Sequence, residues 1–369
     1  MRRRRQLKRS NLIMYALIVL GLILSLSAPR IPRLIEGGYS RSLYRWLSGP
    51  LSRLTGIFPF SLTETLTVGL VLIGLFRLVA LVRRLRKAPG NTVRKIPRAL
   101  GRLALALVVV WVAFNMLWGL NYSRLPFADI AGLPVQPGTA AELKELALYL
   151  TERANDLRAN VSEDDRGVMM LADGVRGALA RADRGFALAA KIYPALGGQY
   201  GRPKGVLLSR LWSYTGITGM YFPFTAEANV NIDIPHFMLP ATAAHEMAHQ
   251  RGFAREDEAN FLAYFACSLH PDADFQYSGT MLALLNTMSA LYRADPDAYA
   301  EVRELYSPGL NRDLRDWAEY WRRHEGPVER ASNKINDSYL KANRQPDGVQ
   351  SYGRMVDLLL AMYRQGKIN

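Results

Sequence analysis

The 369-residue sequence predicts a mainly α-helical protein, with N-terminal transmembrane helices followed by a soluble α+β domain that holds a small sheet. Three observations support this fold class. Three long apolar segments lie within residues 1–122, and the basic residues gather beside them. Residues 123–369 show mostly helical periodicity, interrupted by one stretch of short strand-like runs.

Each apolar segment approaches the roughly 20 residues that a helix needs to cross a bilayer. The segments comprise residues 12–28, 62–82 and 100–120, and loops join them. Arg77 lies inside the second segment, where its long side chain can extend toward the nearer interface. The first segment also has the length of a signal peptide, but Pro29 disfavours cleavage after Ala28. We predict a membrane domain over residues 1–122 and a separate domain over residues 123–369.

The net charge of +15 belongs to the membrane part. Residues 1–122 hold 20 Lys and Arg against Glu36 and Glu64, whereas residues 123–369 hold 27 against 30 acidic residues. Basic residues beside apolar segments indicate membrane topology, so the lipid bilayer is an expected partner and nucleic acid is not. The N-terminus and the loop between the second and third segments are the most basic. They are therefore predicted to be cytoplasmic, in a multi-pass cell-membrane protein whose C-terminal domain is extracytoplasmic.

The domain after the third segment is predicted to be mostly helical. The expected helices are residues 140–159, 167–193, 280–293, 310–323, 327–342 and 353–365. Short strands separated by turn residues are expected at 206–208, 217–222 and 228–232. The single cysteine, Cys267, excludes an intramolecular disulfide and is expected in the core.

The most informative motif is His245-Glu246-Met247-Ala248-His249, an H-E-x-x-H pattern among small uncharged residues. On a helix the two histidines project from the same face one turn apart, so both can bind one metal ion. Glu246 can then accept a proton from a water held by that metal. Buried histidine and glutamate need partners, which a metal supplies. The motif therefore predicts one zinc ion, bound in a zincin-like domain.

A catalytic zinc usually has three protein ligands. Position 255, where the metzincin pattern requires histidine, holds Arg255. The run from Glu256 to Asn260 resembles the Glu-x-x-x-Asp/Asn signature of gluzincins, which implies Glu256 as zinc ligand and Asn260 as the residue that orients a histidine. The separation from His249 is short for that class, so Glu258 remains an alternative, as does a more distant ligand.

The run 228–232 lies about a dozen residues before the motif, where zinc proteases often place an edge strand that pairs with the substrate backbone. Asn229 and Asn231 alternate to one side of this run and are candidates to face the cleft. The alternative is a small sheet that only covers the core.

The chain as a whole resembles the domain-of-unknown-function 3810 family of bacterial membrane proteins. The resemblance is carried by Trp118-Gly119-Leu120-Asn121-Tyr122, by residues 219–229, by residues 245–265 and by residues 336–353. It implies a membrane-bound protein of zinc-peptidase type and supplies no substrate.

These features predict a membrane-anchored zinc-dependent metalloendopeptidase, a hydrolase of extracytoplasmic protein or peptide substrates. Glu246 would be its general base. The alternative is a non-catalytic membrane sensor or scaffold with a retained zinc site. A transporter is disfavoured because the apolar segments hold hardly any charge. Since the motif lies more than a hundred residues beyond the third segment, we expect cleavage in water or at the membrane surface.

Overall fold

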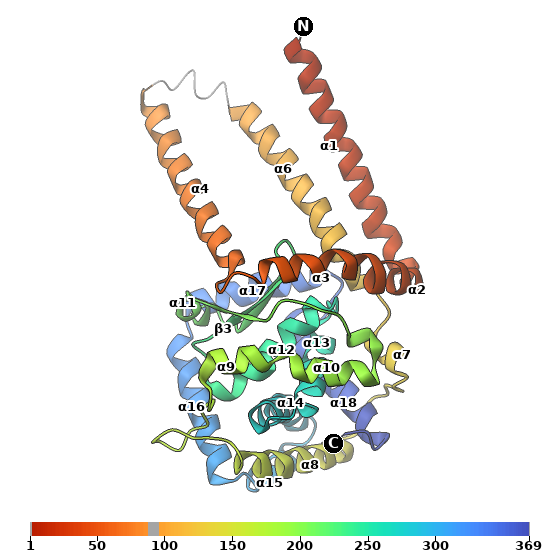
Figure 1. Cartoon of the computed structure of the whole chain (residues 1–369), viewed down its shortest axis with the longest axis vertical. Helices are drawn as coiled ribbons and strands as arrows, with labels where there is room; N and C mark the ends of the chain where they lie inside the picture. The colour runs from red at the N-terminus through yellow and green to blue at the C-terminus, as the bar shows by residue number, and fades with distance from the viewer. Residues whose placement is uncertain (1, 88–95, 369) are drawn as a thin grey trace.

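The computed structural model describes residues 2–87 and 96–368, and it is mainly helical with one small sheet. Three long helices project from one end of a helical body (Figure 1). They are α1 (Arg2–Ser27), α4 (Leu62–Lys87) and α6 (Ile96–Leu117). Each contains a stretch long and apolar enough to cross a membrane, which confirms the three predicted spans at that level. Helix α6 ends at Leu117, before the predicted limit, because Trp118 and the next residues turn into the body.

The segment between the first two spans is helical, although the sequence suggests a loop. It consists of η1 (Ala28–Arg30), α2 (Pro32–Leu34), the π-helix η2 (Ile35–Leu43) and α3 (Tyr44–Thr55). We call this segment the crosswise segment. In Figure 1 it lies across the ends of the projecting helices that meet the body, which we call their feet. Tyr39 and Tyr44 are buried on its inner side, whereas Leu43, Trp46 and Leu54 are exposed. Gly37, Gly38 and Pro50 weaken its helical pattern in the sequence.

The body is built around α12 (Leu239–Gln250), α13 (Glu256–Ser268) and α14 (Ala273–Ala294), whose buried residues form the centre of the core. Alanines at 241, 243, 244 and 248 let neighbouring elements approach α12 closely. The other helices of the body are η3 (Gly119–Ser123), α7 (Phe127–Ala131), α8 (Ala140–Arg158), α9 (Gly174–Arg181), α10 (Asp183–Ile192), η4 (Pro194–Leu196), α11 (Ser209–Ser213), η5 (His236–Met238), α15 (Pro296–Arg303), α16 (Pro308–His324), α17 (Pro327–Ala342), η6 (Gly348–Arg354) and α18 (Met355–Arg364).

Most predicted helices of the body are present. Helix α17 has the predicted limits, and the predicted stretch 167–193 is divided into α9 and α10. Helix α15 was not expected, although Asp295 caps it and Pro296 opens it, which is an ordinary start signal. Cys267 is buried, as predicted.

The sheet has the order β1-β3-β2, formed by β1 (Lys204–Val206), β2 (Gly219–Phe222) and β3 (Glu227–Asn231). Strand β1 is parallel to β3, and β2 is antiparallel to it. The predicted edge strand is therefore the central strand, and the cleft role of Asn229 and Asn231 is wrong. Their amides are buried and donate to the carbonyl oxygens of Met220 (3.1 Å) and Ile217 (2.9 Å). Strand β2 is the edge strand beside α12.

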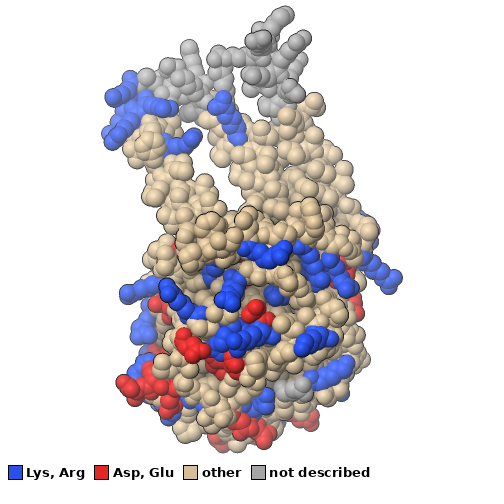
Figure 2. All heavy atoms as spheres, in the orientation of Figure 1, with Lys and Arg blue, Asp and Glu red and all other residues tan. Residues whose placement is uncertain are grey.

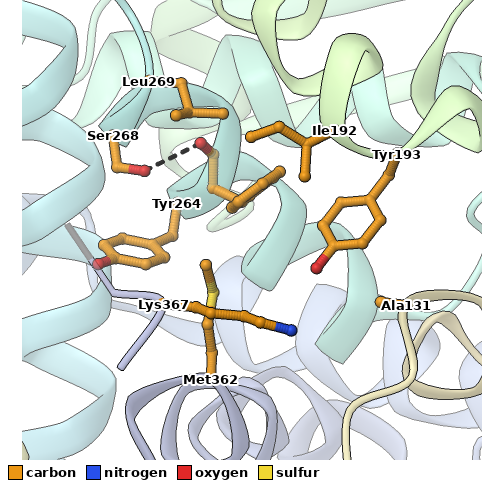
Figure 3. A pocket seen from close by; sticks show the side chains of 9 residues that line it. Ala131, Ile192, Tyr193, Tyr264, Ser268, Leu269, Met362 and Lys367 are labelled. Atoms are coloured by element: carbon orange, nitrogen blue, oxygen red, sulfur yellow. Dashed lines mark hydrogen bonds between the residues drawn. The ribbon is translucent and has the colours of Figure 1, made fainter. Parts of the chain in front are cut away.

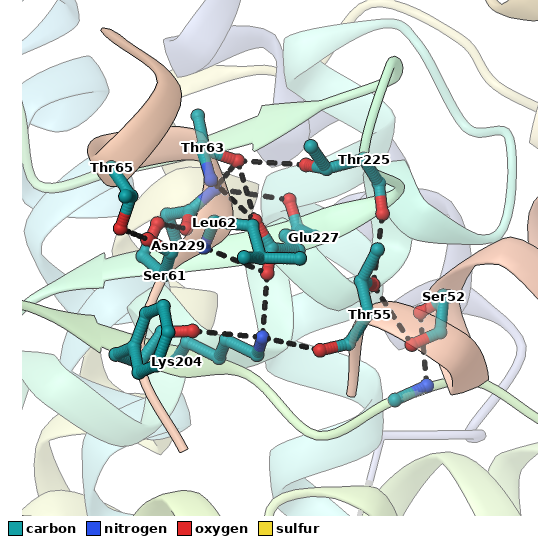
Figure 4. A network of polar contacts seen from close by, with 12 residues as sticks. Ser52, Thr55, Ser61, Leu62, Thr63, Thr65, Lys204, Thr225, Glu227 and Asn229 are labelled. Carbon is teal, nitrogen blue, oxygen red and sulfur yellow. Dashed lines mark hydrogen bonds and ion pairs between the residues drawn. The ribbon is translucent and has the colours of Figure 1, made fainter. Parts of the chain in front are cut away.

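The first turn of α4 is fixed to the sheet by a buried polar network (Figure 4). The Glu227 carboxylate accepts the backbone N–H groups of Leu62 (3.1 Å) and Thr63 (2.7 Å). Lys204 Nζ donates to Glu227 at 2.5 Å and to the Thr55 carbonyl oxygen at 2.7 Å. Although burial alone would raise it, the pKa of Glu227 is lowered by Lys204 and Thr63. The carboxylate therefore stays charged and joins α3, α4 and the sheet.

A second buried connection joins the crosswise segment to the end of α12. Arg124 binds Glu36 through two hydrogen bonds of 2.8 and 2.9 Å, and it also donates to the Gly252 carbonyl oxygen at 3.0 Å. Its guanidinium lies 3.9 Å from the centre of the Phe253 ring. The predicted boundary at residues 122/123 cuts through these contacts, so residues 28–63 contribute to the body that holds the motif.

Replacing Glu36 with alanine should destabilise this arrangement strongly, because it leaves the buried Arg124 guanidinium without its counter-charge. The side chains of Arg124 and Glu36 are only 2% and 8% exposed. Breaking one partner of such a pair costs about 3–5 kcal/mol. For a body of this size that corresponds to a fall in Tm of roughly 6–20 °C, measurable on the full chain in detergent. Glu301→Ala, which breaks an exposed pair with Lys144, should cost less than about 1 kcal/mol and serves as the control. Equal losses in both variants would contradict the expectation.

Candidate metal centre

The structure brings together His245 and His249 from α12 and Glu256 from the first turn of α13. One ligand atom from each of the three side chains lies within 4.8 Å of the others. Glu256 Oε2 is 3.1 Å from His245 Nε2 and 3.4 Å from His249 Nε2. Tetrahedral ligand atoms about 2.0–2.1 Å from a zinc ion are separated by roughly 3.3 Å. In these three groups, which we call the His-His-Glu cluster, the two distances from Glu256 therefore match those between ligand atoms of one zinc ion, and the remaining distance is within 4.8 Å.

Both imidazoles are oriented so that their Nε2 atoms face the same point. His245 Nδ1 is 2.8 Å from the Asn260 amide oxygen, and His249 Nδ1 is 2.7 Å from the Phe253 carbonyl oxygen. An acceptor at Nδ1 places the proton there and leaves the Nε2 lone pair free for a metal. Asn260 is itself held, because its amide nitrogen donates to the Tyr352 carbonyl oxygen at 3.1 Å. The proposed orienting role of Asn260 thus has the required geometry.

The short connection between α12 and α13 depends on Gly252. Its φ is +85°, in the left-handed region. A Cβ atom at this position would lie 3.0 Å from the Tyr44 ring and 3.1 Å from the Asn121 amide oxygen. Both the conformation and the space require glycine. The turn places Glu256 opposite the histidines after only six intervening residues.

Glu246 points from α12 toward the edge strand β2. Its carboxylate accepts the backbone N–H of Tyr221, and it lies so close to Gly219 that a Cβ there would come within 2.4 Å of Oε1. Oε2 is buried and has no hydrogen-bond partner among the described residues. Burial raises the pKa of Glu246, although His245 and His249 act in the opposite direction. A buried carboxylate with a free oxygen and a raised pKa suits a general base.

Within the His-His-Glu cluster, Glu256 and His249 affect each other's pKa values. Burial disfavours charge on Glu256 and on His249. The imidazoles of His249 and His245 nevertheless hold the pKa of Glu256 well below its ordinary value. In turn the Glu256 carboxylate overcomes burial and raises the pKa of His249 to about 9. The buried Glu256 carboxylate is therefore stabilised by a positive charge close to it. Either a protonated imidazole or a metal cation can supply that charge.

Glu258, the alternative third ligand, faces away from the histidines. Its carboxylate accepts the Phe127 backbone N–H at 2.8 Å and lies 3.4 Å from Arg255 Nη1. Burial raises the pKa of Glu258 to about 7, against the influence of Arg255. Glu258 therefore fixes the start of α7, and the structure favours Glu256 as the third member of the cluster.

Arg251, two residues after the motif, lies inside the body. Its guanidinium donates to the carbonyl oxygens of Leu196 and Met247, both at 2.9 Å, and lies 4.1 Å from the centre of the Phe186 ring. Burial lowers the pKa of Arg251 to about 10.

Aromatic residues to which the sequence assigned no role at the site line the side of the cluster that faces the projecting helices. Trp118, directly after α6, packs edge-on against His249 with ring centres 5.8 Å apart, and against Tyr221 at 4.8 Å. Tyr44 of the crosswise segment donates to the Gln250 carbonyl oxygen at 3.1 Å and lies 3.0 Å from the Tyr221 hydroxyl. Trp118 and Tyr221 lie in runs that carry the family resemblance, whereas no sequence signal pointed to Tyr44.

Two tyrosines from the C-terminal part of the chain also pack around the cluster. Tyr352 stacks on His245 with ring centres 6.2 Å apart, and its hydroxyl contacts Glu256. Tyr339 of α17 lies 3.2 Å from the Tyr122 hydroxyl. The side chains of His245, His249 and Glu256 are in consequence only 12%, 9% and 9% exposed.

An open cavity of about 420 Å³ lies elsewhere, between α10, α13 and α18 (Figure 3). Its walls are mainly apolar, with Ile192, Tyr193, Leu269 and Met362 around the ammonium of Lys367. None of its lining residues belongs to the His-His-Glu cluster. The candidate site is therefore the cluster and not this cavity.

Comparison with known proteins gives one family. Residues 39–360 match the family described as "Protein of unknown function (DUF3810)", and no curated protein and no solved structure matches the chain. The match extends from the crosswise segment through α4, α6, the sheet and the His-His-Glu cluster to α18. Since one family covers most of the chain and the whole candidate site, the protein belongs to the DUF3810 family.

Proposed function

We propose that the protein is a membrane-anchored zinc-dependent endopeptidase. The observation that carries this proposal is the pairing of two features on α12 and α13. Three side chains have the spacing of a zinc site, and a fourth, Glu246, presents an unpaired buried oxygen next to them. A purely structural metal site has no use for that carboxylate, whereas peptide hydrolysis requires a base at this position.

His245, His249 and Glu256 would hold the ion, with Asn260 and the Phe253 carbonyl oxygen fixing the imidazoles. Zinc, when bound, supplies a positive charge that polarises a substrate carbonyl and lowers the pKa of a bound water toward about 7. Glu246 would accept a proton from the attacking water and return it to the leaving nitrogen. Tyr352, whose ring stacks on His245, is a candidate to donate to the developing oxyanion.

The basic residues support the proposed orientation in the cell membrane. The last turn of α4, at the end of that helix far from the body, holds Arg84, Arg86 and Lys87 (Figure 1). Figure 2 shows Lys and Arg side chains at the same end of the projecting helices. The positive-inside rule assigns that end to the cytoplasm. The body with the His-His-Glu cluster would then face the extracytoplasmic side, where the protein or peptide substrates would be met.

The proposal predicts that the full chain, purified in detergent, binds about one zinc per molecule and cleaves unfolded casein. Zinc content by atomic emission and fragment formation on gels measure the two parts. Removal of the metal with a chelator should stop cleavage, and added zinc should restore it. The full chain is required because residues 28–63 contribute to the body. A folded, zinc-free preparation would refute the metal site.

The low exposure of the cluster favours a second candidate function. With Tyr352, Tyr339 and Trp118 around it, the site could hold zinc as part of a non-catalytic membrane sensor or scaffold. Zinc at one equivalent, together with no cleavage of any unfolded substrate, would favour that function over hydrolysis.

A further inference from the structure

We propose that the site acts on the juxtamembrane segment of a membrane-inserted polypeptide, which enters between α4 and α6 and pairs with the edge of β2. This inference rests on the proposed function and names its substrate class. It narrows the expectation of cleavage in water or at the membrane surface to the membrane surface, because the motif is distant from the third span in sequence but close to it in space.

The His-His-Glu cluster lies directly beneath the end of the third apolar helix. Helix α6 ends at Leu117, and the next side chain, Trp118, contacts His249. The same indole also contacts Tyr221 in β2. One aromatic side chain therefore separates the membrane end of α6 from both a candidate metal ligand and the edge strand. A scissile bond held here would lie at the membrane interface.

Helix α17, which covers the cluster, also lies near the end of α6 that meets the body. Arg344, just beyond its end, donates to the Ser25 carbonyl oxygen, and Ser25 belongs to the first candidate span. Val328, Ile335 and Tyr339 project as an exposed apolar stripe at helical spacing along α17. An exposed apolar stripe at this height is typical of a helix that meets the headgroup region.

Strand β2 lies between the feet of α4 and α6. On one side Tyr221 packs against Trp118 at the foot of α6. On the other side the turn after β2 reaches Thr63 in the first turn of α4, where the Thr225 and Thr63 hydroxyls are 2.7 Å apart (Figure 4). A chain that descends between the two helices therefore arrives at β2.

The unpaired side of β2 presents backbone groups next to Glu246. The Asn231 N–H donates to the Thr218 carbonyl oxygen at 2.8 Å, so residues 218, 220 and 222 face β3 in the antiparallel pattern. The alternate residues Gly219 and Tyr221 then direct their backbone groups away from β3. Tyr221 N–H is already bound to Glu246. An extended peptide that pairs with this edge would lie across the base and the cluster.

Helix α4 offers an apolar surface that is not used by the described part of the chain. Helices α1 and α6 pack on each other, with the Trp111 ring where a Cβ of Gly21 would be. By contrast, no residue in the apolar window of α4 is buried, and Leu70, Ile73 and Phe76 are exposed. Figure 2 shows open space between α4 and the other two helices above the body. A transmembrane segment can pack there while its extension reaches β2.

The strand edge decides between a polypeptide and a lipid as the occupant. Acyl chains can cover α4, but they provide neither N–H nor carbonyl groups in the repeat that a strand edge requires. A peptide backbone provides both. The combination of an unpartnered apolar helix with a strand edge at its foot therefore fits a membrane-inserted polypeptide.

The test uses single-span reporter proteins reconstituted with the full chain in vesicles of phosphatidylethanolamine and phosphatidylglycerol. In one reporter a randomised segment follows the span directly, and in the other a flexible Gly/Ser linker of about 30 residues separates them. We expect the direct reporter to be cleaved at least about tenfold faster, because the linker lets the segment leave the interface. Both reporters share the membrane, so co-localisation alone cannot produce the difference.

Unfolded casein, assayed in detergent, separates this inference from the proposed function. Casein cleavage with equal rates for both reporters, or with neither reporter cleaved, would overturn the inference and leave the proposed function intact. Failure to cleave casein and both reporters would refute the proposed function, and the inference with it. Cleavage of the direct reporter alone, even without casein cleavage, would support the inference.

A binding measurement in the inactive Glu246→Gln background tests the position of the substrate. The only native cysteine is buried, so an introduced one can be crosslinked selectively. Met220→Cys places a thiol on β2, where the side chain is 39% exposed, and Leu305→Cys places one at a 54% exposed site near α15, away from the projecting helices. With a bis-maleimide and a reporter carrying cysteine directly after its span, we expect crosslinking at 220 and not at 305. Equal crosslinking at both positions, or none at 220, would overturn the inference.

Discussion

Replacing Glu246 with glutamine is expected to abolish peptide hydrolysis while leaving the metal bound. Glutamine keeps the shape of the side chain, and its amide can still lie against Gly219, but it cannot accept a proton. Loss of a positioned general base typically lowers the rate by about 10²–10⁴-fold. Glu246 is not a member of the His-His-Glu cluster, so zinc content should remain near one per chain. Cleavage rate and zinc content, measured on the same preparation, check both parts.

The matched control is Glu304→Gln, which makes the same chemical change at an exposed glutamate outside the site. This variant should retain full activity and zinc. An active Glu246→Gln protein would remove the hydrolytic mechanism. A Glu246→Gln protein that loses zinc would instead indicate that this carboxylate holds the metal.

The second large effect is expected at the third metal ligand. Glu256→Gln removes the charged oxygen that lies 3.1 and 3.4 Å from the two imidazoles, whereas Glu258→Gln alters a carboxyl that binds the Phe127 backbone. Both residues are buried glutamates in the first turn of α13, which makes them a closely matched pair. We expect Glu256→Gln to lose stoichiometric zinc and all activity, and Glu258→Gln to keep both.

Competition with a fluorescent chelator measures the two affinities. A weakening of at least about 100-fold for Glu256→Gln would exceed the 10–100-fold effect usual for residues that only orient a ligand. His245→Ala provides the reference for complete loss. The opposite order, with zinc lost only in Glu258→Gln, would require a different arrangement of α12 and α13 from the one observed.

The results for the Glu246 and Glu256 variants also decide between the enzyme and the sensor. Both candidate functions require His245, His249 and Glu256 to hold the metal. Only the enzyme requires Glu246 as a base and an open path along β2. A zinc-binding protein in which Glu246→Gln and wild type behave alike in every assay would be a scaffold.

The sequence alone determined the features that depend on local periodicity. The three apolar helices follow from continuous runs of apolar residues, and the pairing of His245 with His249 follows from the i, i+4 spacing of a helix. Gly252, which suits the left-handed turn, and the acidic residues that open α13 are likewise local features of the chain. These parts of the fold need no knowledge of the rest of the chain.

Only the tertiary structure decided which acid joins the histidines and which strand is the edge. Glu256 and Glu258 are two residues apart, so they project about 200° apart around α13, and the packing of α13 on α12 selects between them. The run 228–232 was predicted to be an edge strand from its position before the motif, yet pairing with β1 and β2 on both sides places β3 in the centre.

The position of the site relative to the membrane also came from tertiary structure alone. Well over a hundred residues separate the end of α6 from α12, yet Trp118 lies 5.8 Å from His249. The crosswise segment, weakly patterned because of Gly37, Gly38 and Pro50, becomes helical against the buried Arg124 and the end of α12. Local propensity reflects the nearest few residues, whereas burial and hydrogen bonding between distant segments determine which faces meet.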